Sequence, residues 1–411
     1  LLLIAYSINP KEKILLLCLA RLYKDMYKYE ESIKIVNELL SINPDCADAY
    51  ILMAQNYMDT FNYEQALQYY DIAIKLKPDD LNFQHGRAVA LKYLERFDES
   101  KEILENIVKH DNSTQESKLA LSMFYLQNKE FKKGMELYHL SSESLKDTEY
   151  GSDNIWDPGK DIDNKTILIY SNCGFGDNIM WSRYLPFLNK KAKNIILKTD
   201  IDLVAIMQES FPYISVIKKS DDSPEHDIFL QLMDIQYLLD MDFSNIPSSS
   251  GYLRVNEDAV KMFSNLDIFK GTKKKIGLFW QGNKKILKNR SVNYDLIKDF
   301  TNNKKYDFYS FQISEAIQET NNFFDLSKHI KDYSDTAALL KNIDLLITID
   351  SSIAHMAGAL GVKTYLMLPK VAEWRWFYDE KTTPWYDSVT IFKQKESNNW
   401  KEVFDRIKKT L

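Results

Sequence analysis

The residues best suited to chemistry in this chain follow a short apolar run. Asp350, Ser351 and Ser352 come directly after the run 345–349, and His355 lies three positions further on, in a segment with helical character. The free amides in the first turn of a helix carry partial positive charge, and serine hydroxyls can donate hydrogen bonds. The pattern therefore predicts a site for a diphosphate, held without a metal. Two plainer roles stay open, because a serine at this place can cap the helix and a lone histidine is often a packed side chain.

A second turn of this kind is built from glycine. The apolar run 166–170 leads into Gly174, Phe175, Gly176 and Asp177. The two glycines would let the backbone approach a substrate closely. The carboxylate of Asp177 would face a cleft if the run is a strand of a parallel sheet. Asp177 could equally cap the helix that follows.

Apolar runs of strand length recur through the second part of the chain, with helix-like segments between most of them. Such alternation implies parallel sheets. A polar run at 245–250, followed by Gly251 and a new strand near 276, suggests two α/β lobes with a cleft between them. The predicted strands are 166–170, 194–197, 276–280, 307–311, 345–349, 364–368 and 389–392.

The first part of the chain has a longer period. Pro10, Pro44 and Pro78 recur at a spacing of 34 residues, the period of the tetratricopeptide repeat. Small residues share this period where paired helices would touch, at Ala20, Ala54, Ala88 and Ser122 and again at Ser32, Ala66, Ser100 and Gly134. Residues 1–140 are therefore predicted to form a tetratricopeptide superhelix, whose groove suits a protein or peptide partner. The sequence of residues 7–10 returns at 41–44, so further repeats are expected ahead of residue 1.

Composition narrows the possible partners. A net charge of -6 argues against a nucleic-acid or anionic membrane surface, which needs clustered lysine and arginine. Three cysteines without a CxxC pair suit a reducing compartment and disfavour a disulfide framework or a cysteine zinc site. The longest apolar run, 14–20, is too short to cross a bilayer. We therefore expect a cytoplasmic protein with no membrane span and no nucleic-acid partner.

The segment 350–361 resembles the nucleotide-sugar segment of bacterial heptosyltransferase-like glycosyltransferases. Other motifs occur in the order typical of the branch that fuses tetratricopeptide repeats to such a domain. These are Gly174-Phe175-Gly176-Asp177 with Arg183-Tyr184, the run 276–283, Arg290-Ser291, the run 309–312, the run 335–338, and Trp374-Arg375-Trp376.

This resemblance implies a GT-B fold with two Rossmann-like lobes and a closing C-terminal helix, for which 400–411 is the candidate. The expected divisions are a linker at 141–165, an acceptor-side lobe at 166–270 and a nucleotide-sugar lobe at 271–411. GT-B enzymes usually need no divalent metal, so no cofactor is expected beyond the nucleotide-diphosphate sugar that serves as donor. A match to the metal-binding DxD motif at Asp240-Met241-Asp242 is better explained as a solvated helix end.

The resemblance also suggests roles for individual residues. Asp177 would be the base that deprotonates the acceptor, since similar enzymes carry an aspartate at the matching position. Trp374 and Arg375 would line the sugar pocket with Gly174 and Gly176, although paired tryptophans often only pack. Lys284 and Lys285 suit a solvated loop as well as a phosphate. The predicted donor-binding residues are Gly282, Asn283, Arg290, Ser310, Gln312, Asp350, Ser351, Ser352 and His355.

Three functions fit the sequence. The leading one is a glycosyltransferase that modifies a hydroxyl or amide on a protein recruited by the repeats. The second is a non-catalytic scaffold whose GT-B domain only binds nucleotide sugar or is inactive. The third is transfer to a lipopolysaccharide-type glycan, which would leave the repeats without a task.

Overall fold

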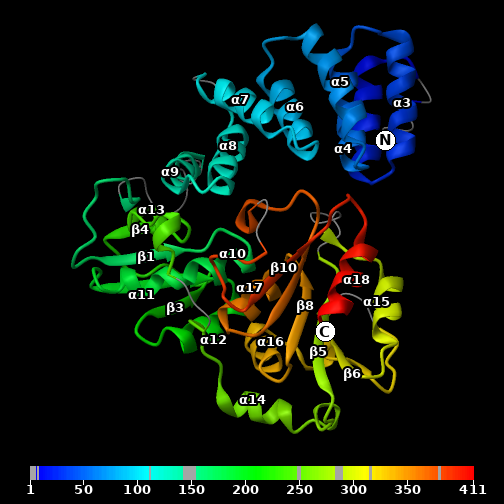
Figure 1. The fold of residues 1–411 in the computed structure, drawn as a ribbon. Coiled ribbons are helices and arrows are strands. Elements are labelled where there is room, and N and C mark those ends of the chain that lie inside the picture. Colours follow the sequence, from blue (N-terminus) through cyan, green and yellow to red (C-terminus); the bar gives the residue numbers. More distant parts are fainter. Residues whose placement is uncertain are drawn as a thin grey trace. The chain divides into compact units, whose positions relative to one another are not determined.

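The computed structural model describes residues 6, 9–110, 113–141, 154–247, 251–282, 290–313, 317–377 and 381–411. The chain forms two compact units (Figure 1). Residues 1–124 and 140–142 make up the first unit, and residues 125–139 and 143–411 make up the second. None of the helices in the described ranges has both the length and the apolar character needed to cross a bilayer.

The first unit consists of paired helices, as the 34-residue period predicts. The small residues predicted to touch between paired helices are in contact. The hydroxyl of Ser32 donates a hydrogen bond to the carbonyl of Ala20 at 2.8 Å, and the hydroxyl of Ser100 donates to the carbonyl of Ala88 at 2.6 Å. All four residues are fully buried, which confirms the tetratricopeptide packing. The repeat helices are α2 (Lys13–Asp25), α3 (Tyr29–Ile42), α4 (Ala47–Asp59), α5 (Tyr63–Leu76), α6 (Leu81–Tyr93), α7 (Phe97–Val108), α8 (Gln115–Gln127) and α9 (Phe131–Ser141).

The turn inside each helix pair contains a residue in the left-handed backbone conformation. Tyr27, Phe61, Glu95 and Lys129 have φ angles of 61°, 63°, 61° and 66°. They follow one another at the repeat period, yet none is a glycine. A left-handed conformation costs a non-glycine residue about 1–2 kcal/mol, so each turn is held by the packing of its helices.

The first lobe of the second unit has a parallel sheet in the order β3-β2-β1-β4. Its strands are mostly buried on both sides, which is typical of a sheet covered by crossover helices. The strand order reverses between β1 and β4, and their carboxyl ends are joined by a hydrogen bond from Asn172 to Gln231 of 2.7 Å. The elements are β1 (Thr166–Tyr170), α10 (Phe175–Trp181), η3 (Ser182–Tyr184), α11 (Leu185–Leu188), β2 (Asn194–Thr199), α12 (Ile201–Ser210), β3 (Ser215–Lys218), β4 (Ile228–Gln231), α13 (Asp234–Leu238) and η4 (Phe243–Asn245).

The second lobe of this unit has a parallel sheet in the order β10-β9-β8-β5-β6-β7. Alternate residues of the central strands, such as Ile276, Leu278 and Ile347, form one core with α15 and α18, while α16 and α17 lie toward the other face (Figure 1). Two Rossmann-like lobes therefore follow the repeats. The elements are α14 (Glu257–Ser264), η5 (Asp267–Phe269), β5 (Lys274–Phe279), α15 (Tyr294–Thr301), β6 (Tyr306–Ser310), β7 (Phe323–Asp325), η7 (Ser327–His329), α16 (Tyr333–Leu340), β8 (Leu345–Ile349), α17 (Ser352–Ala359), β9 (Thr364–Leu368), η8 (Trp374–Trp376), β10 (Val389–Lys393) and α18 (Trp400–Thr410).

The boundaries differ from the predicted ones in three places. Helix α9 falls in the predicted repeat range but belongs to the second unit. Trp156 falls in the predicted linker, yet its amide donates to the carbonyl of Phe229 in β4 at 2.8 Å. Helix α14 falls in the predicted first lobe but contacts α16, and the side chain of Asn342 donates to the carbonyl of Val260 at 3.0 Å. Tertiary contacts rather than changes of composition set these boundaries.

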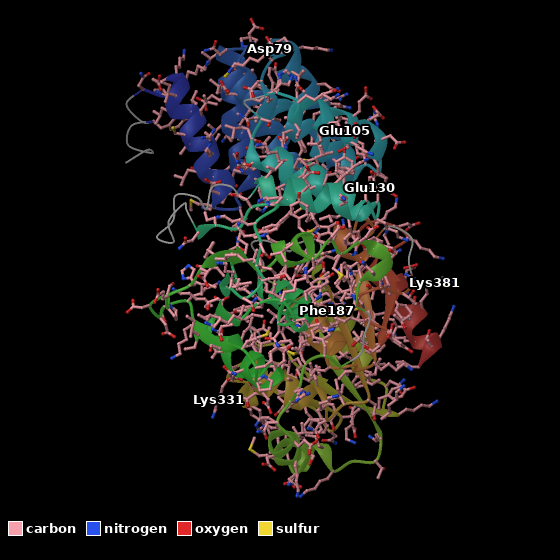
Figure 2. All side chains as sticks on the ribbon, turned by 90° about the vertical axis from the view of Figure 1, so that its left-hand side faces the viewer. Asp79, Glu105, Glu130, Phe187, Lys331 and Lys381 are labelled. Carbon is pink, nitrogen blue, oxygen red and sulfur yellow. The ribbon has the colours of Figure 1, made fainter. Side chains whose placement is uncertain are left out.

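The predicted closing helix is α18, and it packs on the second lobe. Trp400, Val403, Phe404 and Ile407 join the core beneath the second sheet. The ring of Phe404 lies 5.1 Å from that of Phe300 in α15. Figure 2 shows side chains filling the interior of both lobes, whereas charged residues such as Lys331 and Lys381 stand at the surface.

Deleting α9 should destabilise the second unit. The Phe131 side chain is fully buried, with its ring 5.8 Å from Phe243, 6.5 Å from Trp374 and 5.9 Å from Trp385. Truncating one buried phenylalanine costs about 3–5 kcal/mol. A chain beginning at residue 142 should melt well below one beginning at residue 113, and Phe131→Ala in the full chain should show a similar loss. Equal melting temperatures for the two truncated chains would place α9 outside the second unit.

Relieving one left-handed turn should stabilise the repeats. Glu95→Gly should raise the free energy of unfolding by about 0.5–1 kcal/mol, since glycine adopts this conformation freely but gains entropy in the unfolded chain. Glu105 lies inside α7, and Glu105→Gly is the matched control that should lose about 1 kcal/mol. Denaturant unfolding measures both changes. A loss of stability in both variants would contradict the conformational explanation.

Candidate functional site

The candidate site lies where the two lobes of the second unit meet. Helix α10 starts after the carboxyl end of β1, helix α17 starts after the carboxyl end of β8, and the two helices pack against each other. A methyl group added at Gly176 would lie 2.8 Å from Cδ2 of His355 and 3.5 Å from Cα of Ser352. Gly176 therefore lets the two helices pack closely, whereas the nearest atom to such a methyl group at Gly174 is 3.9 Å away.

Asp177 makes an ion pair across the lobes. Its Oδ1 lies 2.5 Å from Nη2 of Arg375. The helix cap is Gly174, so the side chain of Asp177 is not the cap that the sequence left open. Burial raises the pKa of the Asp177 carboxyl, Arg375 opposes this shift, and the carboxylates of Glu373 and Asp350 add to it. A carboxylate with a raised pKa is a stronger base than an ordinary aspartate.

Further ion pairs extend from Arg375. Its Nη1 lies 2.7 Å from Oε2 of Glu373, whose Oε1 is 3.6 Å from Nη2 of Arg290. Nη1 of Arg290 lies 2.7 Å from Oδ2 of Asp350. We call Asp177, Arg290, Asp350, Glu373 and Arg375 the charge cluster. Four of its members were predicted from the sequence, and Glu373 was missed because nothing in its local pattern distinguishes it from a surface glutamate.

Aromatic rings hold the guanidinium of Arg375 in place. It lies 4.8 Å from the ring centre of Trp374 and 5.9 Å from that of Trp181. Burial alone would lower the pKa of Arg375, but the charges of Asp177, Glu373 and Asp350 outweigh this effect and raise it. Arg375 is therefore a fixed cation. Trp374 is itself buried and packs 5.9 Å from the ring of Trp181, so its described contacts are internal.

The serines at the start of α17 do not cap it through their side chains. Ser351 is at the N-cap position without a side-chain cap hydrogen bond, and its hydroxyl donates to the carbonyl of Ile349 at 3.1 Å. The hydroxyl of Ser352 accepts a hydrogen bond from Tyr333 at 2.6 Å. The first amides of a helix lack partners within the helix. This end of α17 thus keeps the electrostatic character that suits an anion.

His355 is buried in the same helix. Its Nδ1 lies 2.9 Å from the hydroxyl of Tyr386, and its ring stacks 5.0 Å from that of Trp376. Burial lowers the pKa of His355 well below its ordinary value, and the nearby arginines lower it further. The imidazole is therefore neutral near pH 7. It packs between the lobes, against Gly176 of α10 and Trp376 of η8.

Other residues that were predicted to bind the nucleotide sugar make hydrogen bonds within the protein itself. The side-chain oxygen of Gln312 accepts from the amide of Gln281 at 3.0 Å, and the hydroxyl of Ser310 accepts from the amide of Gln312 at 3.2 Å. The amide of Gly282 donates to Ser291 at 3.3 Å. These contacts shape the end of β5 and leave a ligand role for Ser310 and Gln312 untested. Asn283, Lys284 and Lys285 lie outside the described residues.

Arg183 joins the lobes by a contact that the sequence did not reveal. Its Nη1 donates to the carbonyl of Trp385 at 2.9 Å, and its guanidinium lies 4.9 Å from the ring centre of Tyr386. The same group faces the ring of Tyr252 at 5.0 Å. In the sequence, Arg183 was recognised only as part of the motif that accompanies residues 174–177.

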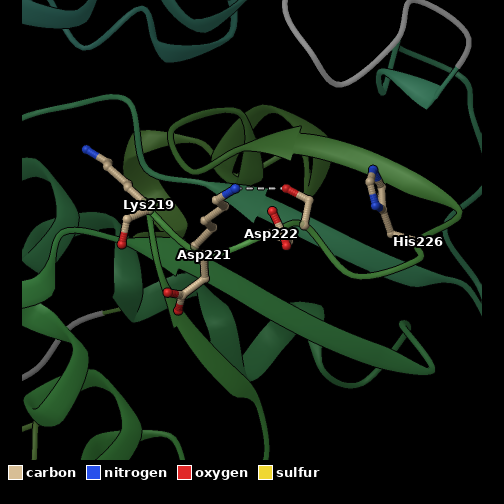
Figure 3. Close-up of a pocket in the computed structure, with 7 residues that line it drawn as sticks. Lys219, Asp221, Asp222 and His226 are labelled. Atoms are coloured by element: carbon tan, nitrogen blue, oxygen red, sulfur yellow. Dashed lines mark hydrogen bonds between the residues drawn. The ribbon is translucent and has the colours of Figure 1, made fainter.

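A cavity of about 420 Å³ opens at the carboxyl ends of β2 and β3 (Figure 3). The buried Lys198 donates to the hydroxyl of Ser223 at 2.9 Å, and Lys219 pairs with Asp200 at 2.8 Å. The cation of Lys219 and the carboxylate of Asp177 both influence the thiol of Cys173, whose pKa burial raises. The cavity is lined by lysine and aspartate side chains together with serine and histidine, and these mixed charges suit a polar ligand.

The two aspartates of the DxD match are exposed, as expected of a solvated helix end. The side chain of Asp242 accepts a hydrogen bond from the amide of Phe243 at the start of η4, and Asp240 lies 3.8 Å from Lys132. Within the described ranges, no group of three or more histidine, cysteine, aspartate or glutamate side chains could hold a metal ion.

Comparisons with known proteins support the repeats most clearly. Residues 47–80 and residues 16–46 match family models of the tetratricopeptide repeat. No curated protein matches the chain. The structure resembles YrrB, a TPR protein with an unusual peptide-binding site, at 15% identity and a TM-score of 0.30 over 34% of this chain and 73% of YrrB.

Two other solved structures are similar to parts of the chain. A thermophilic TPR protein from Thermus thermophilus is 18% identical, with a TM-score of 0.33 over 36% of this chain and 80% of its own. A glycosyl transferase family 9 protein from Veillonella parvula is 15% identical, with a TM-score of 0.45 over 61% of this chain and 91% of its own. These likenesses are too weak to assign an activity, which must be inferred from the contacts of the site.

Filling the space at Gly176 should weaken the contact between the lobes. Gly176→Ala should lower the free energy of unfolding by about 1–3 kcal/mol, because the His355 ring is fixed by Trp376 and Tyr386 and cannot move aside. Gly174→Ala is the matched control, since the added methyl group has room. Thermal unfolding compares them. If Gly176→Ala were as stable as Gly174→Ala, the close packing would not matter.

Proposed function

We propose that this protein is a glycosyltransferase that moves a sugar from a nucleotide-diphosphate donor to an acceptor hydroxyl or amide. The observation that carries the proposal is the charge cluster, in which a partly buried carboxylate with a raised pKa lies beside a fixed arginine and close to the start of α17. A general base and a site for a leaving diphosphate are the two requirements of glycosyl transfer.

In this reaction Asp177 accepts the proton of the acceptor as the acceptor oxygen or nitrogen forms a bond to the anomeric carbon. The bond from that carbon to the diphosphate breaks, and the diphosphate leaves with the electron pair. Arg290 and Arg375 match phosphate oxygens through their forked donors, and the start of α17 adds its partial positive charge. No metal is needed for these roles.

The tetratricopeptide repeats support a protein or peptide acceptor, since such repeats present extended grooves. A scaffold without activity is the alternative, but it gives no reason for gathering several charges in partly buried positions. Buried ion pairs stabilise a fold weakly because desolvation offsets their attraction. The charge cluster therefore favours catalysis over a purely structural role. Transfer to a lipopolysaccharide-type glycan would use the same site and leave the repeats unexplained.

Asp177→Asn should separate catalysis from binding. A thermal-shift screen of nucleoside diphosphates, with a chelator present, first identifies a ligand. Release of that nucleotide from the corresponding nucleotide sugar should then fall about 100- to 10,000-fold in Asp177→Asn, because the amide keeps the shape but cannot accept the proton. Nucleotide affinity should not weaken. Near-normal turnover would exclude Asp177 as the base. If the unchanged protein bound nucleotide without turnover of the nucleotide sugar, or bound no nucleotide, the scaffold would be favoured.

A further inference from the structure

Glu373 lies between the two arginines of the charge cluster. One of its oxygens is 2.7 Å from Arg375, and the other is 3.6 Å from Arg290. A single carboxylate thus spans two guanidinium groups that project from different segments of the second lobe. This is the same task that a bridging phosphate or diphosphate would perform.

The remaining donors of these arginines are also partly occupied. Asp177 engages the second terminal nitrogen of Arg375, and Asp350 engages Arg290. By contrast, Nε of Arg375 is buried and has no hydrogen-bond acceptor among the described residues. A buried guanidinium donor without an acceptor is costly, so this nitrogen suits an anionic acceptor beyond the described side chains.

The charge cluster contains three carboxylates and two guanidinium groups, so its formal charge is negative. A diphosphate brought beside it would be repelled by the carboxylates unless one of them moved away. Tight binding of the anion therefore requires a rearrangement within the cluster.

Glu373 is the member best able to move. Its side chain is 25% exposed, against 21% for Asp177 and 7% for Asp350, which is fixed at the end of β8. Asp177 belongs to helix α10, whereas Glu373 lies in extended backbone just before η8. The longer glutamate side chain can turn toward solvent without a change in the backbone.

We propose that Glu373 is an internal competitor of the ligand: its carboxylate engages the two guanidinium groups that would bind a diphosphate, and it must be displaced for tight binding. This inference rests on the proposed function, and it names Glu373 as the residue that limits affinity for the donor. Displacement also affects Asp177. If Arg375 turns toward phosphate, Asp177 loses the cation that opposes its raised pKa and becomes a stronger base once the donor is bound.

Binding of inorganic pyrophosphate to the full chain tests this inference. Glu373→Gln removes the charge and keeps the shape, so calorimetry should show a dissociation constant about tenfold lower than that of the unchanged protein. Glu373→Asp keeps the charge and should bind no more tightly than the unchanged protein. Glu402→Gln is the matched control, because Glu402 pairs with Arg406 at 3.0 Å on α18, outside the cluster, and its loss should leave pyrophosphate binding unchanged.

A gain in affinity cannot arise from damage to the fold, so it distinguishes competition from a structural role. Equal or weaker pyrophosphate binding by Glu373→Gln would overturn the inference, and it would leave the proposed function intact if nucleotide sugars still bind and turn over. Tighter pyrophosphate binding without any turnover of nucleotide sugars would support the competitor role and count against the proposed function. If neither protein bound pyrophosphate, the inference would fail, and the turnover of nucleotide sugars would still decide the proposed function.

Discussion

The ion pair between Asp177 and Arg375 is the contact on which the arrangement of the site depends. It joins the first turn of α10 in one lobe to the short helix η8 of the other at 2.5 Å. Removing two charges from water is expensive, so a pair of this kind persists only when its surroundings hold both groups in place. The rings of Trp181 and Trp374 enclose the guanidinium, and the close packing at Gly176 brings α10 against α17.

The order of helices and strands could be predicted from the sequence, because both the helix pairs and the apolar strands recur along the chain. A period of 34 residues located the helices, and buried runs such as β1, β8 and β9 were found at their observed positions. The strands β3, β4 and β7 were missed. They span three or four residues each, and a run that short carries too little periodicity to be distinguished from a loop. The left-handed turns were also missed, since glycine is the usual signal for that conformation and these turns contain none.

The candidate site was predicted in part. The local sequence pattern identified Asp177 and the start of α17, because each follows a predicted strand and lies at the beginning of a predicted helix. It could not show that Asp177 meets Arg375, or that Glu373 joins two arginines, since ion pairs between distant segments leave no periodic trace. The sequence also could not show in which direction a side chain points. Gln312 follows a strand as expected, yet its amide group turns inward to hold the end of β5.

Helix α9 packs against the loop that carries Arg375. The next residues of that loop include Phe377, which has a φ angle of 55° that is unfavourable for an aromatic residue. Its ring lies 6.5 Å from Phe131 of α9 and 5.4 Å from Phe243, and Lys129 lies over it at 5.6 Å. An unfavourable backbone conformation persists only where packing enforces it. The last helix with the repeat period therefore helps to fix the loop that places the arginine on Asp177, so a helix of the repeat pattern contributes directly to the geometry of the site.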